Sequence, residues 1–164
     1  IRELVGDVVD MLRLRAESGG VQLASEVADD VPAGVLLDVG KLRQILVNLL
    51  GNAVKYTDRG SVTVSVSWQG GEAGTLLRIA VRDTGRGLTA EDCQRIFEPF
   101  VQGSTRRSGQ DGAGLGLSIS RGFAEAMGLE PVLKTFRARA PWRFLAPQLW
   151  LLPHWPLVSS EGIR

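Results

Sequence analysis

The stretch from residue 38 to residue 83 constrains the fold more than any other part of this sequence. Asp38, a good helix-capping residue, precedes a segment whose apolar side chains recur every three or four positions, which predicts an amphipathic helix ending near residue 56. "SVTVSVSW" (61–68) then alternates polar and apolar residues, and "TLLRIAVRD" (75–83) follows a glycine-rich turn, which predicts a β-hairpin. Such a helix and hairpin bury their apolar faces against each other, so this stretch indicates helices packed on a sheet.

The flanking segments extend the same architecture. Apolar periodicity and stop signals predict an entry helix, a strand, a short capped helix and a glycine-terminated helix, over residues 2–17, 21–27, 89–97 and 115–128. After Gly128 the candidate strands "EPVLKTF" and "WRFLAPQLWLL" are interrupted by prolines. The expected fold class is α+β: a two-layer α/β sandwich of three main helices over a mixed sheet, with C-terminal strands that are atypical or missing.

The composition argues against a membrane-spanning segment, a nucleic-acid partner and an internal disulfide. The 164 residues are 44% hydrophobic and 23% charged, as in ordinary globular domains, and no apolar run approaches the length of a membrane span. A net charge of +1 gives no reason to expect a nucleic-acid partner. A single cysteine permits no internal disulfide. The chain begins without methionine, and we expect it to be a piece of a longer protein.

Two asparagines lie four positions apart in the central helix. Asn48 and Asn52 project from one helical face, although asparagine is a mediocre helix former. An amide oxygen is a suitable ligand for a hydrated Mg²⁺ that phosphates also hold, and Lys55, one turn beyond Asn52, would meet phosphate oxygens. The alternative is a polar face on a surface helix.

Two glycine-rich segments lie downstream. "DTGRG" (83–87) exposes Asp83 in a tight turn, where its carboxylate could accept a hydrogen bond from an exocyclic amine; an ordinary aspartate-initiated turn would look the same. "GAGLGLS" (112–118) runs into a helix whose first N–H groups could bind phosphate, although close packing also produces such loops. It lacks the GK[ST] ending of a P-loop, and no strand precedes it as a dinucleotide fingerprint requires.

Taken in order, these segments resemble four sequence boxes of the ATP-binding catalytic domain of sensor histidine kinases. The asparagine-rich helix, "DTGRG", "FEPF" (97–100) and "GAGLGL" are similar to the N, G1, F and G2 boxes, over roughly residues 20–128. The resemblance implies the Bergerat-type ATP-binding fold shared with gyrase-type ATPases and certain chaperones. It also implies ATP and Mg²⁺ as cofactors.

The resemblance carries a role to each matching position. Asn52 would bind Mg²⁺ with Asn48 in support, and Lys55 would reach the phosphates. Tyr56 would line the nucleotide site, and Asp83 would bind the adenine amino group. The other residues expected at the nucleotide come from the glycine-rich segments and the F box: Gly85, Gly87, Phe97, Gly112, Gly114, Leu115, Gly116 and Leu117.

Several other residues have competing interpretations. Arg106 and Arg107, in the loop before the second glycine-rich segment, could pair with γ-phosphate oxygens or be ordinary solvated charges. Phe100 is expected to pack with the other F-box phenylalanine at the root of a lid over the triphosphate. His154 lies between prolines and is interpreted as incidental, since the family's phosphoacceptor histidine lies upstream. Cys93 is expected to fill a gap on a short helix, with no base beside it to lower its pKa.

Asn48 also bears on the reaction. Hydrolytic relatives carry a glutamate four positions before the metal-binding asparagine, where it activates water, and an amide is a poor base. We therefore expect a protein-histidine kinase, a phosphotransferase whose γ-phosphoryl acceptor lies on a dimerisation domain absent from these residues, so that the fragment alone is inactive. A degenerate nucleotide-binding signalling module without transfer activity is the alternative. An ATPase of the gyrase or mismatch-repair type is disfavoured by Asn48.

The resemblance also predicts the organisation of the parent protein. Residues 1–19 would be a connector or the end of a dimerisation helix, 20–128 the ATP-binding domain, and 129–164 a divergent tail. The expected partners are a histidine-bearing dimerisation domain, in cis or in trans, and a downstream response regulator. The parent protein would be a homodimer with this domain in the cytoplasm, and membrane anchoring of the parent is left open.

The tail departs from the family pattern. Residues 129–164 hold one of the 20 glycines but five of the seven prolines and three of the four tryptophans, and the family's glycine-rich hairpin turn is missing. Such a shift is typical of GC-rich DNA translated out of frame, so we hypothesise a frameshift. Translation of the coding DNA in the other two frames tests this, because one frame should encode the missing turn and strand.

Overall fold

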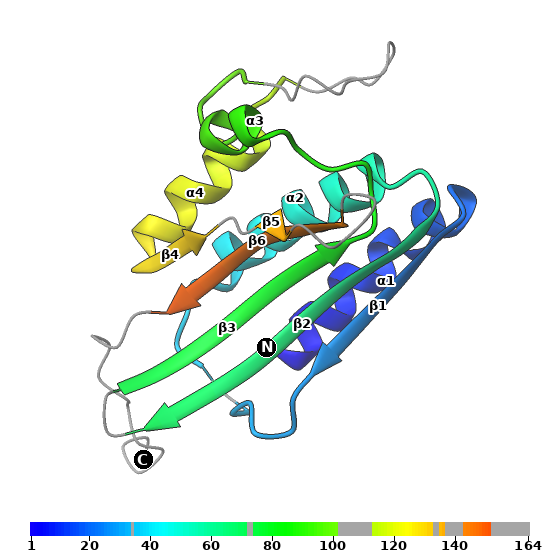
Figure 1. Ribbon diagram of the computed structural model, residues 1–164. Helices are drawn as coiled ribbons and strands as arrows, with labels where there is room; N and C mark the ends of the chain where they lie inside the picture. Colours follow the sequence, from blue (N-terminus) through cyan, green and yellow to red (C-terminus); the bar gives the residue numbers. More distant parts are fainter. Residues whose placement is uncertain (34, 72–73, 102–112, 133–134, 137–142, 152–164) are drawn as a thin grey trace.

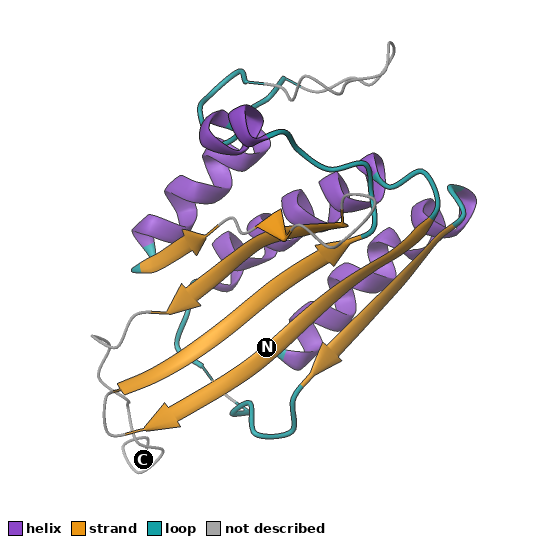
Figure 2. Ribbon diagram, viewed as in Figure 1, coloured by secondary structure: helices purple, strands orange, loops and turns teal. Residues whose placement is uncertain are grey.

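The computed structural model describes residues 1–33, 35–71, 74–101, 113–132, 135–136 and 143–151 (Figure 1). The elements are α1 (Arg2–Ser18), β1 (Val21–Val27), α2 (Val39–Tyr56), β2 (Gly60–Gly71), β3 (Gly74–Asp83), α3 (Ala90–Arg95), α4 (Gly116–Ala126), β4 (Leu129–Val132), β5 (Thr135–Phe136) and β6 (Arg143–Leu151). A sheet forms one layer, and α1 and α2 lie over one of its faces (Figure 2). This arrangement confirms the predicted α+β two-layer sandwich.

The sheet is mixed, as predicted. Its strand order is β1-β2-β3-β6-β4, with β5 paired to β6 off this path. β1 runs parallel to β2, whereas the β2–β3, β3–β6 and β4–β6 pairs are antiparallel. In the β2–β3 hairpin, Val62 is opposite Asp83, so the register places Asp83 at the last paired position of β3.

The described part of the tail supplies strands of atypical sequence. β6 pairs with both β3 and β4, so it extends the sheet beyond the hairpin. The register shifts where Ala80 is opposite Gln148 and Arg82 is opposite Leu145. The residues skipped in β6 include Pro147, which has no N–H to donate to a neighbouring strand. The frameshift hypothesis stays a prediction.

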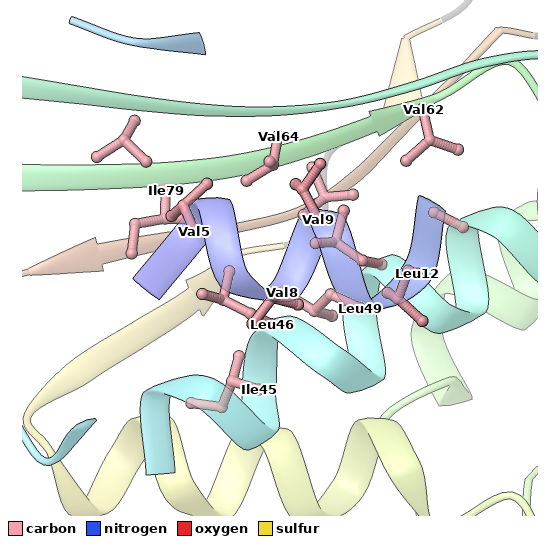
Figure 3. Close-up of a cluster of buried hydrophobic side chains, with 14 of the residues drawn as sticks. Val5, Val8, Val9, Leu12, Ile45, Leu46, Leu49, Val62, Val64 and Ile79 are labelled. Carbon is pink, nitrogen blue, oxygen red and sulfur yellow. The ribbon is translucent and has the colours of Figure 1, made fainter. Parts of the chain in front are cut away.

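The core lies between the sheet and the two long helices. Figure 3 shows Val5 and Val9 of α1 pointing toward the sheet and Val8 lying beside Leu46 and Leu49 of α2. Alternate residues of β2 face these helices, which explains the strict period-two pattern of this strand. The largest fully buried side chains are Leu42, Ile45, Leu46, Leu50, Leu77, Val5, Val8, Val62, Val64, Val66 and Val81.

Local sequence signals account for the ends of the helices. Asp38 caps α2 by accepting a hydrogen bond from the Lys41 N–H (3.0 Å). Thr89 and Asp92 form a reciprocal capping box at the start of α3. α1 ends before Gly20, whose positive φ of 72° suits glycine.

α1 is part of the core of this domain. Its buried residues include Val5 and Val8, and the Arg2 guanidinium donates to the backbone carbonyl oxygens of Val27 (3.1 Å) and Ala28 (3.2 Å) at the end of β1. The further role of residues 1–19 as a connector stays a prediction. Among the described residues, no helix is long and apolar enough to cross a membrane.

Candidate functional site

Asp83 begins a tight turn at the end of β3. Its side chain is half-buried, and its Oδ1 accepts a hydrogen bond from the Gly85 N–H at 2.9 Å. Burial raises the pKa of the Asp83 carboxyl above its ordinary value, and the Gly85 hydrogen bond opposes this shift. Within the described part of the chain the Gly85 N–H is its hydrogen-bond donor, so the Asp83 carboxylate is suited to accept a further hydrogen bond from a ligand.

The turn over residues 83–87 packs directly against the end of α2. A Cβ added to Gly85 would lie 2.5 Å from the Tyr56 carbonyl oxygen and 2.9 Å from Asp83 Oδ1, so no side chain fits there. The Arg86 N–H donates to the same Tyr56 carbonyl oxygen at 3.5 Å. Gly87 has a φ of 78°, which favours glycine. The glycines of this segment therefore permit close contact between the turn and the backbone of α2.

Thr57 is a candidate ligand-binding residue that the sequence did not reveal. Its side chain is 4% exposed, and its hydroxyl oxygen has no hydrogen-bond partner within the described part of the chain. The same oxygen would lie 3.1 Å from a Cβ on Gly85, so it faces the turn that holds Asp83. Its position directly after Tyr56 in the asparagine-rich segment is the one sequence signal that could have identified it.

The last turns of α2 carry the predicted phosphate and metal ligands. Asn52 is half-buried, and its side-chain amide makes no hydrogen bond to any residue that the structure describes. Lys55 Nζ lies 5.3 Å from the centroid of the Tyr56 ring, and Tyr56 is 38% exposed. The Asn52 oxygen is therefore available to a cation, and the Tyr56 ring is accessible to a flat ligand.

Asn48 has a different environment from Asn52. Its Nδ2 donates to the Gly116 carbonyl oxygen (3.1 Å) and to Ser120 Oγ (3.1 Å), and its Oδ1 accepts from Gln44 Nε2 (3.1 Å). The amide thus links α2 to the first turn of α4. The predicted support of Mg²⁺ by Asn48 stays a prediction.

The start of α4 approaches the F-box segment through a glycine. Gly114 has a φ of 70°, and a Cβ there would lie 2.8 Å from the Val101 carbonyl oxygen. The Phe100 N–H donates to the Gly114 carbonyl oxygen at 3.1 Å. Gly116 is the first residue of α4, and Leu115 and Leu117 beside it are half-buried. Backbone contacts therefore hold the second glycine-rich segment against "FEPF".

The F-box phenylalanines differ in exposure. Phe97 is half-buried, but Phe100 is 73% exposed and has a φ of 64°. The expectation that the Phe100 ring packs at the root of a lid is therefore wrong, because its backbone and not its ring makes the contact. Arg106, Arg107, Gly112 and His154 lie outside the described residues.

The described residues offer no other metal site or reactive thiol. They contain no group of three histidine, cysteine, aspartate or glutamate side chains that could hold a metal ion. Burial, with the nearby Asp92 carboxylate, raises the pKa of the Cys93 thiol, which agrees with the prediction that no neighbouring base lowers it. A cation here would depend on Asn52 and on oxygens supplied by a ligand.

The raised pKa of Asp83 predicts how an amide variant depends on pH. Between the ordinary value of 3.8 and the higher folded-state pKa, the unfolded carboxyl ionises first, so the wild type loses stability as pH rises through this window. The Asp83→Asn variant lacks this loss and should be more stable than the wild type at pH 7. Urea unfolding of ligand-free protein should show the difference shrinking as pH falls toward 3.8. A difference independent of pH would contradict the assignment.

Comparison with known proteins identifies the family. Residues 37–141 match the family described as histidine kinase-, DNA gyrase B- and HSP90-like ATPases. The sensory/regulatory protein RpfC of Xanthomonas campestris pv. campestris is 41% identical over 133 residues, which span 78% of this chain and 18% of RpfC. The chain therefore spans less than a fifth of this curated relative.

Solved structures agree with the sequence match. Full-length ShkA in complex with AMPPNP has a TM-score of 0.71 and 36% identity, over 90% of this chain and 28% of ShkA. The mycobacterial sensor histidine kinase MprB shares the fold, with a TM-score of 0.75 and 23% identity over 93% of this chain and 96% of the MprB chain.

The chain belongs to the histidine kinase-, gyrase B- and HSP90-like ATPase family. Within that family it resembles the catalytic domains of sensor histidine kinases, and relatives such as AruS of Pseudomonas aeruginosa carry the name sensor histidine kinase. The predicted Bergerat-type fold is confirmed by these matches.

Proposed function

We propose that this domain binds Mg-ATP and transfers its γ-phosphoryl group to a histidine on a dimerisation domain of the parent protein. The observation that carries the proposal is that one helix, α2, contacts both glycine-rich segments. The Tyr56 carbonyl oxygen meets the 83–87 turn, and Asn48 meets the start of α4. Asn52 lies midway between these contacts, one turn or about 6 Å along the helix axis from each.

This geometry supports one orientation of the nucleotide. The adenine amino group would donate to Asp83, whose half-buried position strengthens a hydrogen bond to a charged acceptor. Tyr56 would cover the adenine, and the triphosphate would run toward the first N–H groups of α4, where Leu115 provides no side-chain cap. Asn52, with phosphate oxygens, would hold Mg²⁺.

The residues present fit transfer better than hydrolysis. No carboxylate takes the position of Asn48, whose amide instead hydrogen-bonds to α4, so activation of water lacks a base at that point. Lys55, Arg106 and Arg107 would stabilise charge on the transferred phosphoryl group. Asn52 would hold Mg²⁺, and the chemistry supplied by the bound ion would be the orientation of the triphosphate for a nucleophile on the partner domain.

The parent protein would be a homodimeric, cytoplasmic kinase that supplies its phosphoryl group to a response regulator. The sensor kinases among the relatives support this partner class. The alternative is a signalling module that binds nucleotide without transfer, and the departure of the tail from the family pattern favours it.

Reconstitution separates these functions. The purified chain should be incubated with Mg-ATP and the histidine-bearing dimerisation domain of the parent protein. Acid-labile phosphohistidine on the dimerisation domain is the expected result. Binding without transfer would support the signalling module, and steady release of inorganic phosphate would instead indicate an ATPase. The Asn52→Ala variant controls for phosphorylation that does not depend on this site.

A further inference from the structure

A chain of polar contacts joins α2 to the start of α4. Asn48 Nδ2 donates both to the Gly116 carbonyl oxygen and to Ser120 Oγ, each at 3.1 Å. Ser120 Oγ in turn donates to the Gly116 carbonyl oxygen at 2.9 Å, and Ser120 is 4% exposed. Both hydrogens of the Asn48 amide nitrogen are therefore directed at α4, toward groups largely removed from solvent.

We propose that Asn48 and Ser120 are a positioning pair that fixes the first turn of α4 relative to Asn52. The proposal rests on the proposed nucleotide-binding function. It differs from the metal-ligand role that the sequence resemblance implies for Asn48, because a metal ligand uses the amide oxygen whereas this link uses the amide nitrogen. Ser120 belongs to neither glycine-rich motif, and the sequence gives it no role.

The start of α4 has no side-chain cap, so this link adds to the backbone contact between Gly114 and Phe100 just before the helix. Leu115, at the N-cap position, forms no side-chain capping hydrogen bond, and Gly116 has no side chain to pack. A Cβ on Gly116 would lie only 3.8 Å from Asn48 Cγ, so the amide packs directly on the helix backbone. The polar link therefore takes the place of an apolar contact at this point.

The link also ties the first N–H groups of α4, which would bind phosphate, to the helix that carries Asn52, the proposed metal ligand. Asn48 and Asn52 lie on successive turns of α2. Because the start of α4 is bound to Asn48, it keeps a fixed distance from the Asn52 oxygen. If the link is broken, the first N–H groups of α4 move independently of the metal ligand. Removing either partner also takes one hydrogen bond from the other, although each keeps its own bond to the Gly116 carbonyl oxygen.

A double-mutant cycle of ADP affinities, measured without metal ions, tests the Asn48–Ser120 pair. ADP affinity should be measured in EDTA for Asn48→Ala, Asn48→Asp, Ser120→Ala and the Asn48→Ala/Ser120→Ala double variant. Each single change should weaken binding roughly three- to tenfold, the ratio for one hydrogen bond of ordinary net strength. The double variant should bind no more weakly than Asn48→Ala, because both changes remove the same link.

Asn48→Asp is the decisive variant, since it keeps an oxygen and removes the donating nitrogen. Ser65→Ala is the matched control: this half-buried serine of β2 donates to the Ala80 carbonyl oxygen (3.5 Å), away from α4, and its loss should leave ADP affinity unchanged. Far-UV circular dichroism establishes folding of each variant. If Asn48→Ala does not fold, Asn48→Asp and Ser120→Ala decide the matter by themselves.

The opposing results are distinct. The positioning role would be wrong if ADP affinity fell only in the Asn48 variants, only with Mg²⁺ present, and was unchanged in Ser120→Ala. That result would favour the metal-ligand role of Asn48. Additive losses in the double variant would also overturn it. A wild-type chain that binds no nucleotide at all would overturn the proposed function, and the positioning role with it.

Discussion

The Asp83→Ala variant should bind ATP roughly tenfold to more than a hundredfold more weakly than the wild type. The change removes a hydrogen bond to a charged acceptor, which is worth about 1.5–3 kcal/mol. Because Asp83 lies at the end of β3, across the 83–87 turn from α2 and its proposed metal ligand, the loss should be the same with and without Mg²⁺. Isothermal titration calorimetry measures both affinities.

An exposed aspartate provides the control for this substitution. Asp10 lies on the exposed side of α1, where it pairs with Arg13 at 2.7 Å, and Asp10→Ala should leave ATP affinity unchanged. A loss at Asp83→Ala that appeared only with Mg²⁺, or no loss at all, would mean that Asp83 does not contact the adenine.

The Leu46→Ala variant should lose about 2–5 kcal/mol of folding free energy. Leu46 is fully buried, and Figure 3 shows it beside Val8 of α1, between the two helices. The residues around it are fixed by other helices and strands, so the cavity cannot collapse completely. Since small domains are stable by only about 5–15 kcal/mol, much of the folded population should be lost on mild heating or at low urea concentration.

Leu14 of α1 is the matched control, because it is 78% exposed. Leu14→Ala should change the unfolding free energy by less than about 0.5 kcal/mol. Equal effects of the two leucine substitutions on the urea midpoint would contradict the placement of Leu46 in the core.

The helices and the central hairpin were predictable because their signals are local. Asp38 caps α2, Thr89 caps α3, and the alternating valines of β2 face the helices, as their spacing indicates. The strands after Gly128 were less predictable, because prolines interrupt the pattern. β6 pairs with β3 with a register shift at Pro147, and the local sequence does not tell which strand β6 pairs with or in which register.

The parts of the candidate site that could be predicted are those where the backbone conformation or close packing requires glycine. The absence of space beside Gly85 and the positive φ of Gly114 follow from the glycines in the motifs. The link from Asn48 to Ser120 spans 72 positions, so no local pattern could reveal it. Thr57 was missed for a related reason, since its burial against the 83–87 turn arises only when β3 and α2 come together.

The central claim is that Asn52 and Asp83 bind opposite ends of one ATP molecule. Calorimetric titration of the folded chain with ATP, with Mg²⁺ and with EDTA, tests it most directly when repeated on Asn52→Ala. The wild type should bind ATP more tightly with Mg²⁺. The variant should lose that advantage, roughly ten- to a hundredfold, and keep its affinity in EDTA. An undiminished Mg²⁺ advantage in Asn52→Ala, or no uptake of ATP by the wild type, would contradict the account.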